Sequence, residues 1–297
     1  MLPRDEHVGE SMYLSTGRGT MAEYVLPIPT LGGKQWWADL VVREGARIQR
    51  HVFTGRHRLL GPRDAAWASG SFEECLQVLE RRCKAPPEGP RHIVLCLHGM
   101  FRSKDSFAPM RRALQRAGFT AEVVNYPSTR GRLSDHVAQV EHILDHVRGP
   151  GRVSFVGHSM GGIVIRMLLG RQGAWTRHLE VGRAVLIGSP NRGAAMVDML
   201  QSSALFRAAG GPAGLALATD EADDWPIPEV PFATIAGIRG NGSGYNPMLR
   251  GEDDMTVRRE SVLLPGAALH VDVRAIHTLL MRHPDVVAQT TRFLRGS

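Results

Sequence analysis

The chain has 297 residues, of which 43% are hydrophobic and 22% are charged. This composition is typical of a globular protein with a sizeable core and excludes a disordered or fibrous chain. The net charge of +7 raises the question of an anionic partner, but the basic residues are scattered singly or in pairs. We therefore expect no nucleic-acid partner, while transient contact with a membrane surface stays compatible with the charge.

Residues 1–35 are polar and contain several glycines and prolines, so we expect a poorly ordered leader there. The first residues are partly acidic and lack an apolar core, unlike a secretory signal. No stretch approaches the roughly 18 apolar residues of a transmembrane helix. Three cysteines are too few for a disulfide framework. These observations favour a cytoplasmic protein with reduced thiols.

Residues 36–43 and 46–53 read as two strands around the turn at Glu44-Gly45, which predicts an antiparallel hairpin. Residues 71–82 form a predicted helix, because Ser71 and Glu74 make a capping box. From residue 92 onward, strands and helices alternate. The expected strands cover residues 92–97, 120–124, 153–156, 181–187, 231–236 and 269–273. The expected helices cover residues 106–117, 133–147, 160–169 and 284–294.

This alternation predicts an α/β fold, with a mostly parallel sheet covered by helices on both faces. We expect residues 36–297 to form one domain. Residues 191–229, called the insert below, interrupt the alternation with a segment rich in Met, Ala and Gly. We interpret the insert as a cap or lid over an apolar pocket. The alternative is a helix simply packed on the sheet.

The segment Gly157-His158-Ser159-Met160-Gly161 lies between a predicted strand and a predicted helix. A serine in such a sharp turn adopts a strained backbone, and the two glycines leave room for it. The turn exposes the serine hydroxyl beside the amino end of a helix, where free N–H groups can bind a developing oxyanion. We therefore predict that Ser159 is a nucleophile.

A serine nucleophile needs a histidine base and a carboxylate that orients the histidine, and in this class they follow in the order Ser, acid, His. His277 follows the last predicted strand and precedes the last helix, so we choose it as the base. The segment before it offers Glu252, Asp253 and Asp254. We choose Asp254 as the acid, with Asp253 as the main rival.

His98-Gly99-Met100 follows the first buried strand. In such a turn, the backbone N–H of Met100 can join that of Met160 in an oxyanion hole. We interpret His98 as a structural residue beneath the turn. His142 and His146 lie one helical turn apart, but neither a general base nor a third ligand accompanies them as in zinc helices. The sequence predicts no metal and no cofactor.

These motifs resemble those of the α/β-hydrolase superfamily, and the chain is most similar to its bacterial lipase/esterase group. The resemblance covers residues 91–297. The matching segments are His98-Gly99-Met100, Gly157-His158-Ser159-Met160-Gly161-Gly162, Gly188-Ser189-Pro190-Asn191-Arg192-Gly193, Asp254 with Val257, and His277. The resemblance implies an α/β-hydrolase fold, the triad Ser159, Asp254 and His277, and the oxyanion amides of Met100 and Met160. The family often has glycine after the acid, where this chain has Met255.

We therefore expect a serine hydrolase that cleaves carboxylic esters through an acyl-enzyme, with a small-molecule ester or lipid as substrate. Amidase, thioesterase, phospholipase or acyltransferase activity uses the same residues. A non-catalytic module that binds an apolar ligand is the alternative from another class, although such a module has no need of the triad.

Overall fold

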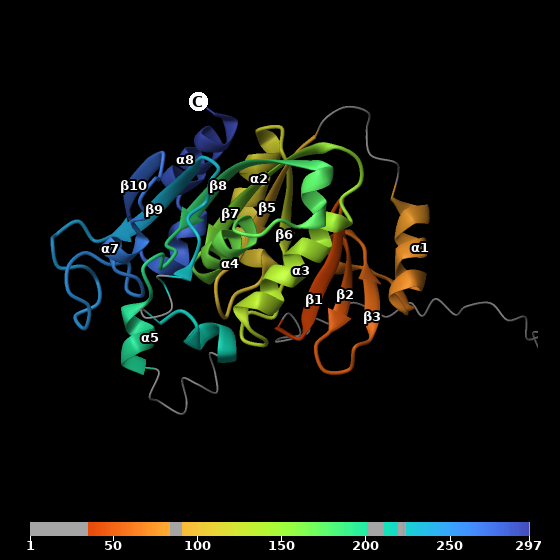
Figure 1. Ribbon diagram of the computed structural model, residues 1–297, viewed down its shortest axis with the longest axis horizontal. Coiled ribbons are helices and arrows are strands. Elements are labelled where there is room, and N and C mark those ends of the chain that lie inside the picture. Colours follow the sequence, from red (N-terminus) through yellow and green to blue (C-terminus); the bar gives the residue numbers. More distant parts are fainter. Residues whose placement is uncertain (1–34, 84–90, 201–210, 219–221, 223, 297) are drawn as a thin grey trace, which may run out of the picture.

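The structure is a computed structural model that describes residues 35–83, 91–200, 211–218, 222 and 224–296. The leader expected at residues 1–35 lies outside the described residues except for Gln35. Figure 1 shows a central sheet with helices on both sides and a smaller sheet beside it.

The central sheet has six strands in the order β10-β9-β8-β7-β5-β6, and every neighbouring pair is parallel. Its strands are β5 (Arg91–Leu97), β6 (Thr120–Val124), β7 (Gly151–His158), β8 (Leu179–Ile187), β9 (Phe232–Ile238) and β10 (Leu269–Arg274). Each contains or overlaps a strand expected from the sequence, and the parallel sheet is confirmed. The chain runs outward from β5 to β6, then returns to β7 on the other side of β5. A parallel sheet binds ligands at such a reversal of strand order, at the carboxyl ends of the strands.

Helices cover both faces of this sheet, as expected from the alternation. Residues of α3 (Leu133–Asp145) and α4 (Met160–Leu169) pack in one apolar cluster, with Ile93 and Leu95 from β5. Residues of α2 (Ala108–Arg116) and α8 (Pro284–Arg295) pack in another, with Val94 and Cys96. Because side chains alternate along a strand, β5 contributes to both clusters and is buried on both faces.

Shorter elements connect this framework. They are the helices α5 (Ala195–Leu200) and α7 (Arg259–Val262) and the 3₁₀ turns η2 (Pro62–Asp64), η3 (Lys104–Phe107), η4 (Ala174–Arg177) and η6 (His277–Arg282). Residues 211–215 are also helical. Within the part of the chain that is described, no helix is long and apolar enough to cross a bilayer.

The amino-terminal part forms a separate antiparallel sheet in the order β1-β2-β3-β4. Its strands are β1 (Trp37–Arg43), β2 (Ala46–His51), β3 (His57–Leu60) and β4 (Ala66–Gly70), followed by α1 (Phe72–Arg82). The expected hairpin is confirmed as β1 and β2, and the predicted capping box of Ser71 and Glu74 is present. We did not predict β3 and β4, which are only four and five residues long.

A buried polar network joins this small sheet to the central sheet. The carboxylate of Asp39 on β1 accepts hydrogen bonds from Arg47 Nη1 at 2.8 Å, Gln49 Nε2 at 2.7 Å and the backbone N–H of Asn125 at 2.7 Å. The backbone of Asp39 also pairs with Asn125 and with Gln139 of α3. These contacts tie β1 to the end of β6 and to α3, and the single domain over residues 36–297 stays a prediction.

We predict that Asp39→Ala lowers the free energy of unfolding by about 3–5 kcal/mol, because the buried Arg47 loses its close carboxylate partner and two further donors lose their acceptor. Arg47 then keeps only its longer contacts, to the Val123 carbonyl at 3.5 Å and to Asp64 Oδ1 at 3.9 Å. Urea unfolding measures this change. Asp145→Ala, at the exposed end of α3, is the control and is expected to change stability by less than about 0.5 kcal/mol. Equal stability of the two variants would contradict the role given to the network.

Candidate active site

Two turns from the predicted site meet at the reversal of strand order between β5 and β7. The turn after β5 carries Gly99 and Met100, and the turn after β7 carries Ser159. The two turns are in direct contact, because a Cβ atom added to Gly99 would lie 2.9 Å from the Cβ of Ser159. The sheet therefore brings together residues that are 60 positions apart in the sequence.

The backbone of Ser159 is strained, with φ 55° and ψ −126°. Residues other than glycine rarely adopt this region of φ and ψ. The flanking glycines allow this turn through close contacts. A Cβ on Gly157 would lie 2.5 Å from the N of Gly162, and a Cβ on Gly161 would lie 2.3 Å from the carbonyl O of Leu97. The structure thus contains the strand–turn–helix geometry that the sequence motif predicts.

His277 follows β10 and opens η6, and Asp254 lies in the loop after β9. The Nδ1 atom of His277 lies 2.7 Å from Asp254 Oδ2, and the backbone N–H of His277 donates to the carbonyl of Asp254 at 2.8 Å. Both residues are buried. Because Nδ1 is engaged by the carboxylate, Nε2 is the ring nitrogen that remains to exchange a proton.

The three neighbouring acids make different contacts. Asp254 Oδ1 accepts the backbone N–H groups of Thr256 and Val257, while its Oδ2 lies against His277. The carboxylate of Asp253 accepts backbone N–H groups of residues 245, 246 and 255. Glu252 accepts backbone N–H groups of residues 239, 240 and 242, which lowers the pKa of its carboxyl group. Of these three acids, Asp254 is the one bonded to His277.

The turn after β5 has a buried histidine beneath it. His98 Nδ1 lies 2.8 Å from the carbonyl O of Gly99, and Nε2 faces the backbone N–H of Tyr126 at 3.4 Å. Burial lowers the pKa of His98 to about 4, so the ring is neutral at pH 7. Met160 is the first residue of α4, and the first N–H groups of a helix have no partner inside it. The role of the Met100 and Met160 amides in an oxyanion hole stays a prediction.

Two further residues beside the predicted site have a positive φ angle. Phe101 follows Met100 with φ 59°, and Met255 follows Asp254 with φ 83°. Both side chains are about half exposed, at 54% and 50%. Backbone strain of this kind costs about 1–3 kcal/mol per residue and gathers at functional sites. Each of the three segments that meet here, around residues 100, 159 and 254, therefore holds one strained residue.

Arg166 of α4, which our reading of the sequence missed, holds both ends of the insert. Its guanidinium group is buried and donates to the carbonyl groups of Asn191 at 2.7 Å, Trp225 at 2.7 Å and Pro226 at 2.9 Å. The available signal was a single arginine within the apolar run 163–169. The insert is thus fixed at its base to the helix that begins at Ser159.

The described parts of the insert border the predicted site on two sides. A Cβ on Gly214 would lie 2.8 Å from the sulfur of Met100. The loop between β9 and α7, which carries Asp254 and is called the acid loop below, contacts α5 through the amide of Asn246 and the sulfur of Met196. In Figure 1, α5 and the helical segment after it extend beyond the sheet at the lower edge of the view. Residues 201–210, 219–221 and 223 of the insert lie outside the described residues.

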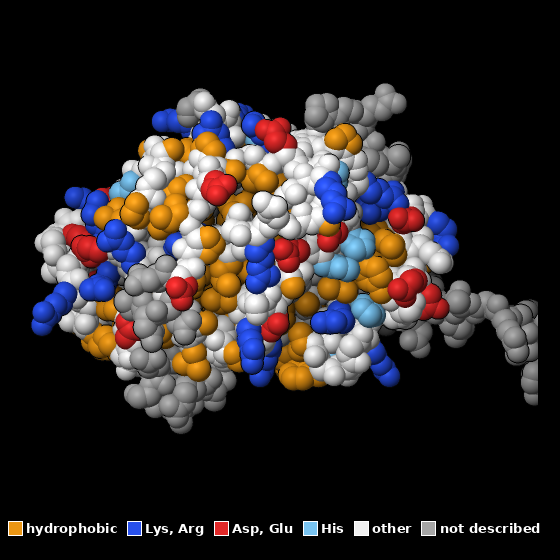
Figure 2. Space-filling model, viewed as in Figure 1, with side chains coloured by type: hydrophobic (Ala, Val, Ile, Leu, Met, Phe, Trp, Pro, Cys, Tyr) orange, Lys and Arg blue, Asp and Glu red, His pale blue; other side chains and the backbone are white. Residues whose placement is uncertain are grey.

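The histidine pair considered for a metal packs around an aromatic ring instead. The rings of His142 and His146 lie 5.6 and 5.4 Å from that of Phe72, and His57 lies 5.9 Å from it. In Figure 2, pale blue histidine side chains gather beside hydrophobic ones near α1. No group of three or more metal-ligating side chains is found among the residues described.

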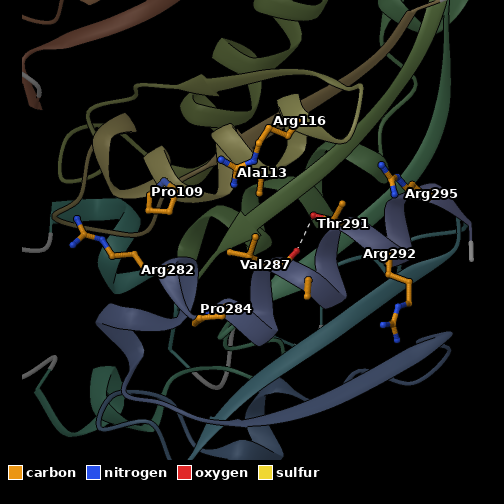
Figure 3. A pocket seen from close by; sticks show the side chains of 10 residues that line it. Pro109, Ala113, Arg116, Arg282, Pro284, Val287, Thr291, Arg292 and Arg295 are labelled. Carbon is orange, nitrogen blue, oxygen red and sulfur yellow. Dashed lines mark hydrogen bonds between the residues drawn. The ribbon is translucent and has the colours of Figure 1, made fainter.

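A surface hollow of about 700 Å³ lies between α2 and α8, away from Ser159 and His277. Figure 3 shows that arginines from α2, η6 and α8 surround it. They are Arg116, Arg282, Arg292 and Arg295. The sequence separates these residues into three elements, so their grouping could not be seen from charge runs. None of the predicted catalytic residues lines this hollow.

The sheet order and the serine turn define an α/β-hydrolase fold, and comparisons with known proteins agree. The profile of the Alpha/beta hydrolase family matches residues 94–239. The mature lipase BlEst2 of Bacillus licheniformis is similar at a TM-score of 0.56 and 21% identity, over 71% of this chain and 96% of that chain. The lin2722 gene product of Listeria innocua is similar at 0.50 and 15%, over 70% and 95%. No curated protein matches the chain. The chain has the fold of the α/β-hydrolase superfamily, and residues 94–239 match the model of one of its families.

We predict that the positive φ of Met255 lowers the stability of the folded chain and that glycine at this position removes the strain. Met255→Gly is expected to change the free energy of unfolding by less than about 1 kcal/mol, since relieved strain offsets the greater freedom of the unfolded chain. Met255→Val is expected to cost more than about 2 kcal/mol, because a β-branched residue tolerates a positive φ poorly. Thermal unfolding of both variants measures this, and a Val variant as stable as the Gly variant would contradict it.

Proposed function

We propose that this hydrolase cleaves carboxylic esters, with Ser159 as nucleophile, His277 as base and Asp254 as the acid that orients the base. The observation that carries the proposal is the 2.7 Å contact between His277 Nδ1 and Asp254 Oδ2. His277 in turn contacts His158, the residue directly before Ser159. The fold alone does not determine the reaction, so the assignment depends on these side chains.

In the proposed reaction, the Ser159 oxygen attacks the ester carbonyl carbon while His277 Nε2 takes the serine proton. The tetrahedral intermediate then expels the alcohol, which receives that proton from His277. Water attacks the resulting acyl-serine, again with His277 as base, and releases the acid and the free serine. Asp254 holds the imidazole in the tautomer with hydrogen on Nδ1 and stabilises the cation that forms transiently.

The backbone N–H groups of Met100 and Met160 are the proposed donors to the intermediate's oxyanion. Each such donor contributes about 3 kcal/mol of transition-state stabilisation. Both donors come from the backbone, so substitution of either methionine side chain leaves them in place. No metal or cofactor is needed for these steps.

The insert is the proposed cap over the substrate, and it favours an apolar acyl group. It touches Met100 on one side and the acid loop on the other. Three large apolar side chains close to site residues in the sequence are half exposed. Phe101 and Met255 directly follow site residues, and Leu279 lies two residues after His277. Adaptable apolar surfaces of this kind suit an acyl chain.

The three cysteines are free and buried, which supports the cytoplasm as the proposed compartment.

We predict that a fluorophosphonate probe labels the wild-type chain and that Ser159→Ala abolishes this labelling. Hydrolysis of a p-nitrophenyl ester is expected to fall by about 10⁵- to 10⁶-fold in Ser159→Ala and His277→Ala. Asp254→Asn is expected to lower kcat by about 10³- to 10⁴-fold, because the imidazole loses its orienting anion.

Asp253→Asn is the matched control. Its carboxylate holds backbone N–H groups of its own loop, so we expect lower stability but activity within about tenfold of the wild type. An unlabelled wild type would point to a binding module rather than an enzyme. Activity that depends on Asp253 and survives Asp254→Asn would overturn the choice of acid.

We also predict that kcat/KM for p-nitrophenyl esters rises with acyl length from two to six carbons. Burial of each added methylene contributes up to about 0.8 kcal/mol, or about fourfold. Leu279→Ser is expected to flatten this dependence. Phe53→Ser, at a position that is also exposed (66% against 49%) but lies on the turn after β2, is expected to leave it unchanged. Equal rates across the series would rule out an apolar acyl site.

A further inference from the structure

His158 is a buried polar residue that the proposed reaction does not use. It ends β7, directly before Ser159, and only 1% of it is exposed. Burial of an imidazole without hydrogen bonds costs free energy, so an apolar residue is the simpler choice where only space needs filling. The contacts of this ring therefore deserve an explanation.

The ring of His158 contacts the proposed base directly. Its Nε2 atom lies 3.0 Å from the backbone carbonyl O of His277, and the two ring centroids are 4.5 Å apart with their planes at 44°. A carbonyl oxygen only accepts hydrogen bonds, so Nε2 of His158 carries a hydrogen and donates it. The contact fixes which nitrogen of His158 is protonated.

The same ring is neutral at pH 7. Burial lowers the pKa of His158 well below its ordinary value, and the nearby His277 lowers the pKa further. With the hydrogen on Nε2, the Nδ1 atom has only a lone pair, and it has no hydrogen-bond partner among the described residues. His158 is thus a fixed donor that brings no second positive charge to the base.

Three of the polar groups of His277 are engaged. Its backbone N–H donates to the carbonyl of Asp254, its Nδ1 faces the carboxylate of Asp254, and its carbonyl accepts from His158. The acid loop therefore holds the residue from one side, and the strand that carries Ser159 holds it from the other. The contact from His158 ties the base to the serine turn through one adjacent residue.

We propose that His158 is a positioning residue, whose Nε2–H bond to the His277 carbonyl sets where the imidazole of His277 stands relative to Ser159. The expected effect on rate rests on the proposed function, whereas the expected effect on the position of the His277 imidazole does not. A misplacement of about 1 Å between reacting groups costs about 100-fold in rate, so the loss of this bond affects turnover more than substrate binding.

The test compares substitutions that keep or remove the donor. His158→Gln places an amide N–H where Nε2 lies, His158→Phe keeps a ring without a donor, and His158→Asn has a donor too short to reach the His277 carbonyl. His92→Gln is the control, because His92 lies on β5 and contacts Ser154 rather than the site. Urea unfolding first establishes which variants are folded.

The kinetic readout is kcat and KM for p-nitrophenyl acetate. We expect His158→Phe to lower kcat by about 10- to 100-fold with KM within about twofold of the wild type. We expect His158→Gln to retain kcat within about threefold, and His92→Gln to match the wild type. If the Phe variant does not fold, His158→Asn replaces it and is expected to show the same loss.

The second readout does not require activity. The proton on His277 Nδ1, bonded to Asp254, is expected to give a strongly downfield proton NMR resonance that disappears in His277→Ala. We expect this resonance to persist in His158→Gln and to shift or broaden in His158→Phe or His158→Asn. An inactive wild type would end the proposed function, while the resonance would still decide the positioning role.

Two results would overturn the inference. One is wild-type kcat and an unchanged resonance in a folded variant that lacks the donor. The other is an equal loss in the folded Gln and Phe variants, which would show that the shape of the imidazole, rather than its hydrogen bond, supports the site.

Discussion

The backbone at Ser159, with φ 55° and ψ −126°, is the constraint on which the rest of the site depends. This conformation persists only where the surrounding structure holds it. Gly157 and Gly161 let the turn approach α4 and the end of β5 closely enough for backbone atoms to touch. The same approach brings Gly99, the residue before Met100, against Ser159, the proposed nucleophile. The proposed oxyanion hole therefore follows from backbone packing at the centre of the sheet, where side-chain substitutions have little influence on it.

Strain is not confined to the serine. Phe101 and Met255 also hold a positive φ, each directly after a residue of the proposed site. Around Met255, the carboxylates of Asp253 and Asp254 accept backbone N–H groups on both sides of the strained position. These bonds stabilise the loop against the cost of its conformation. They also account for a methionine at a position where the positive φ favours glycine.

The sequence predicted the framework well because buried strands and amphipathic helices leave strong patterns. All six central strands overlap their expected ranges, and the serine turn follows from the spacing of Gly157 and Gly161. Patterns along the chain were less informative where contacts between distant residues determine which side chains form the site. From the sequence we chose Asp254 over Asp253 with little to separate the two residues. Their different contacts appear only in the folded loop. Arg166 stood out only as a single arginine in an apolar run, and neither it nor His158 revealed its partners, which lie 25 to 60 and 119 residues away.

The anchoring of the insert by Arg166 has a consequence for how such a site can vary. A buried guanidinium that donates to three carbonyl groups is replaced only at the cost of leaving those groups without donors. The two ends of the insert are therefore held on α4, the helix that directly follows Ser159, the proposed nucleophile. Residues between these ends can change the surface presented to a substrate without moving Ser159. With the insert as the proposed cap and Ser159 as the proposed nucleophile, substrate preference varies separately from the geometry of the reaction, although both depend on the same helix.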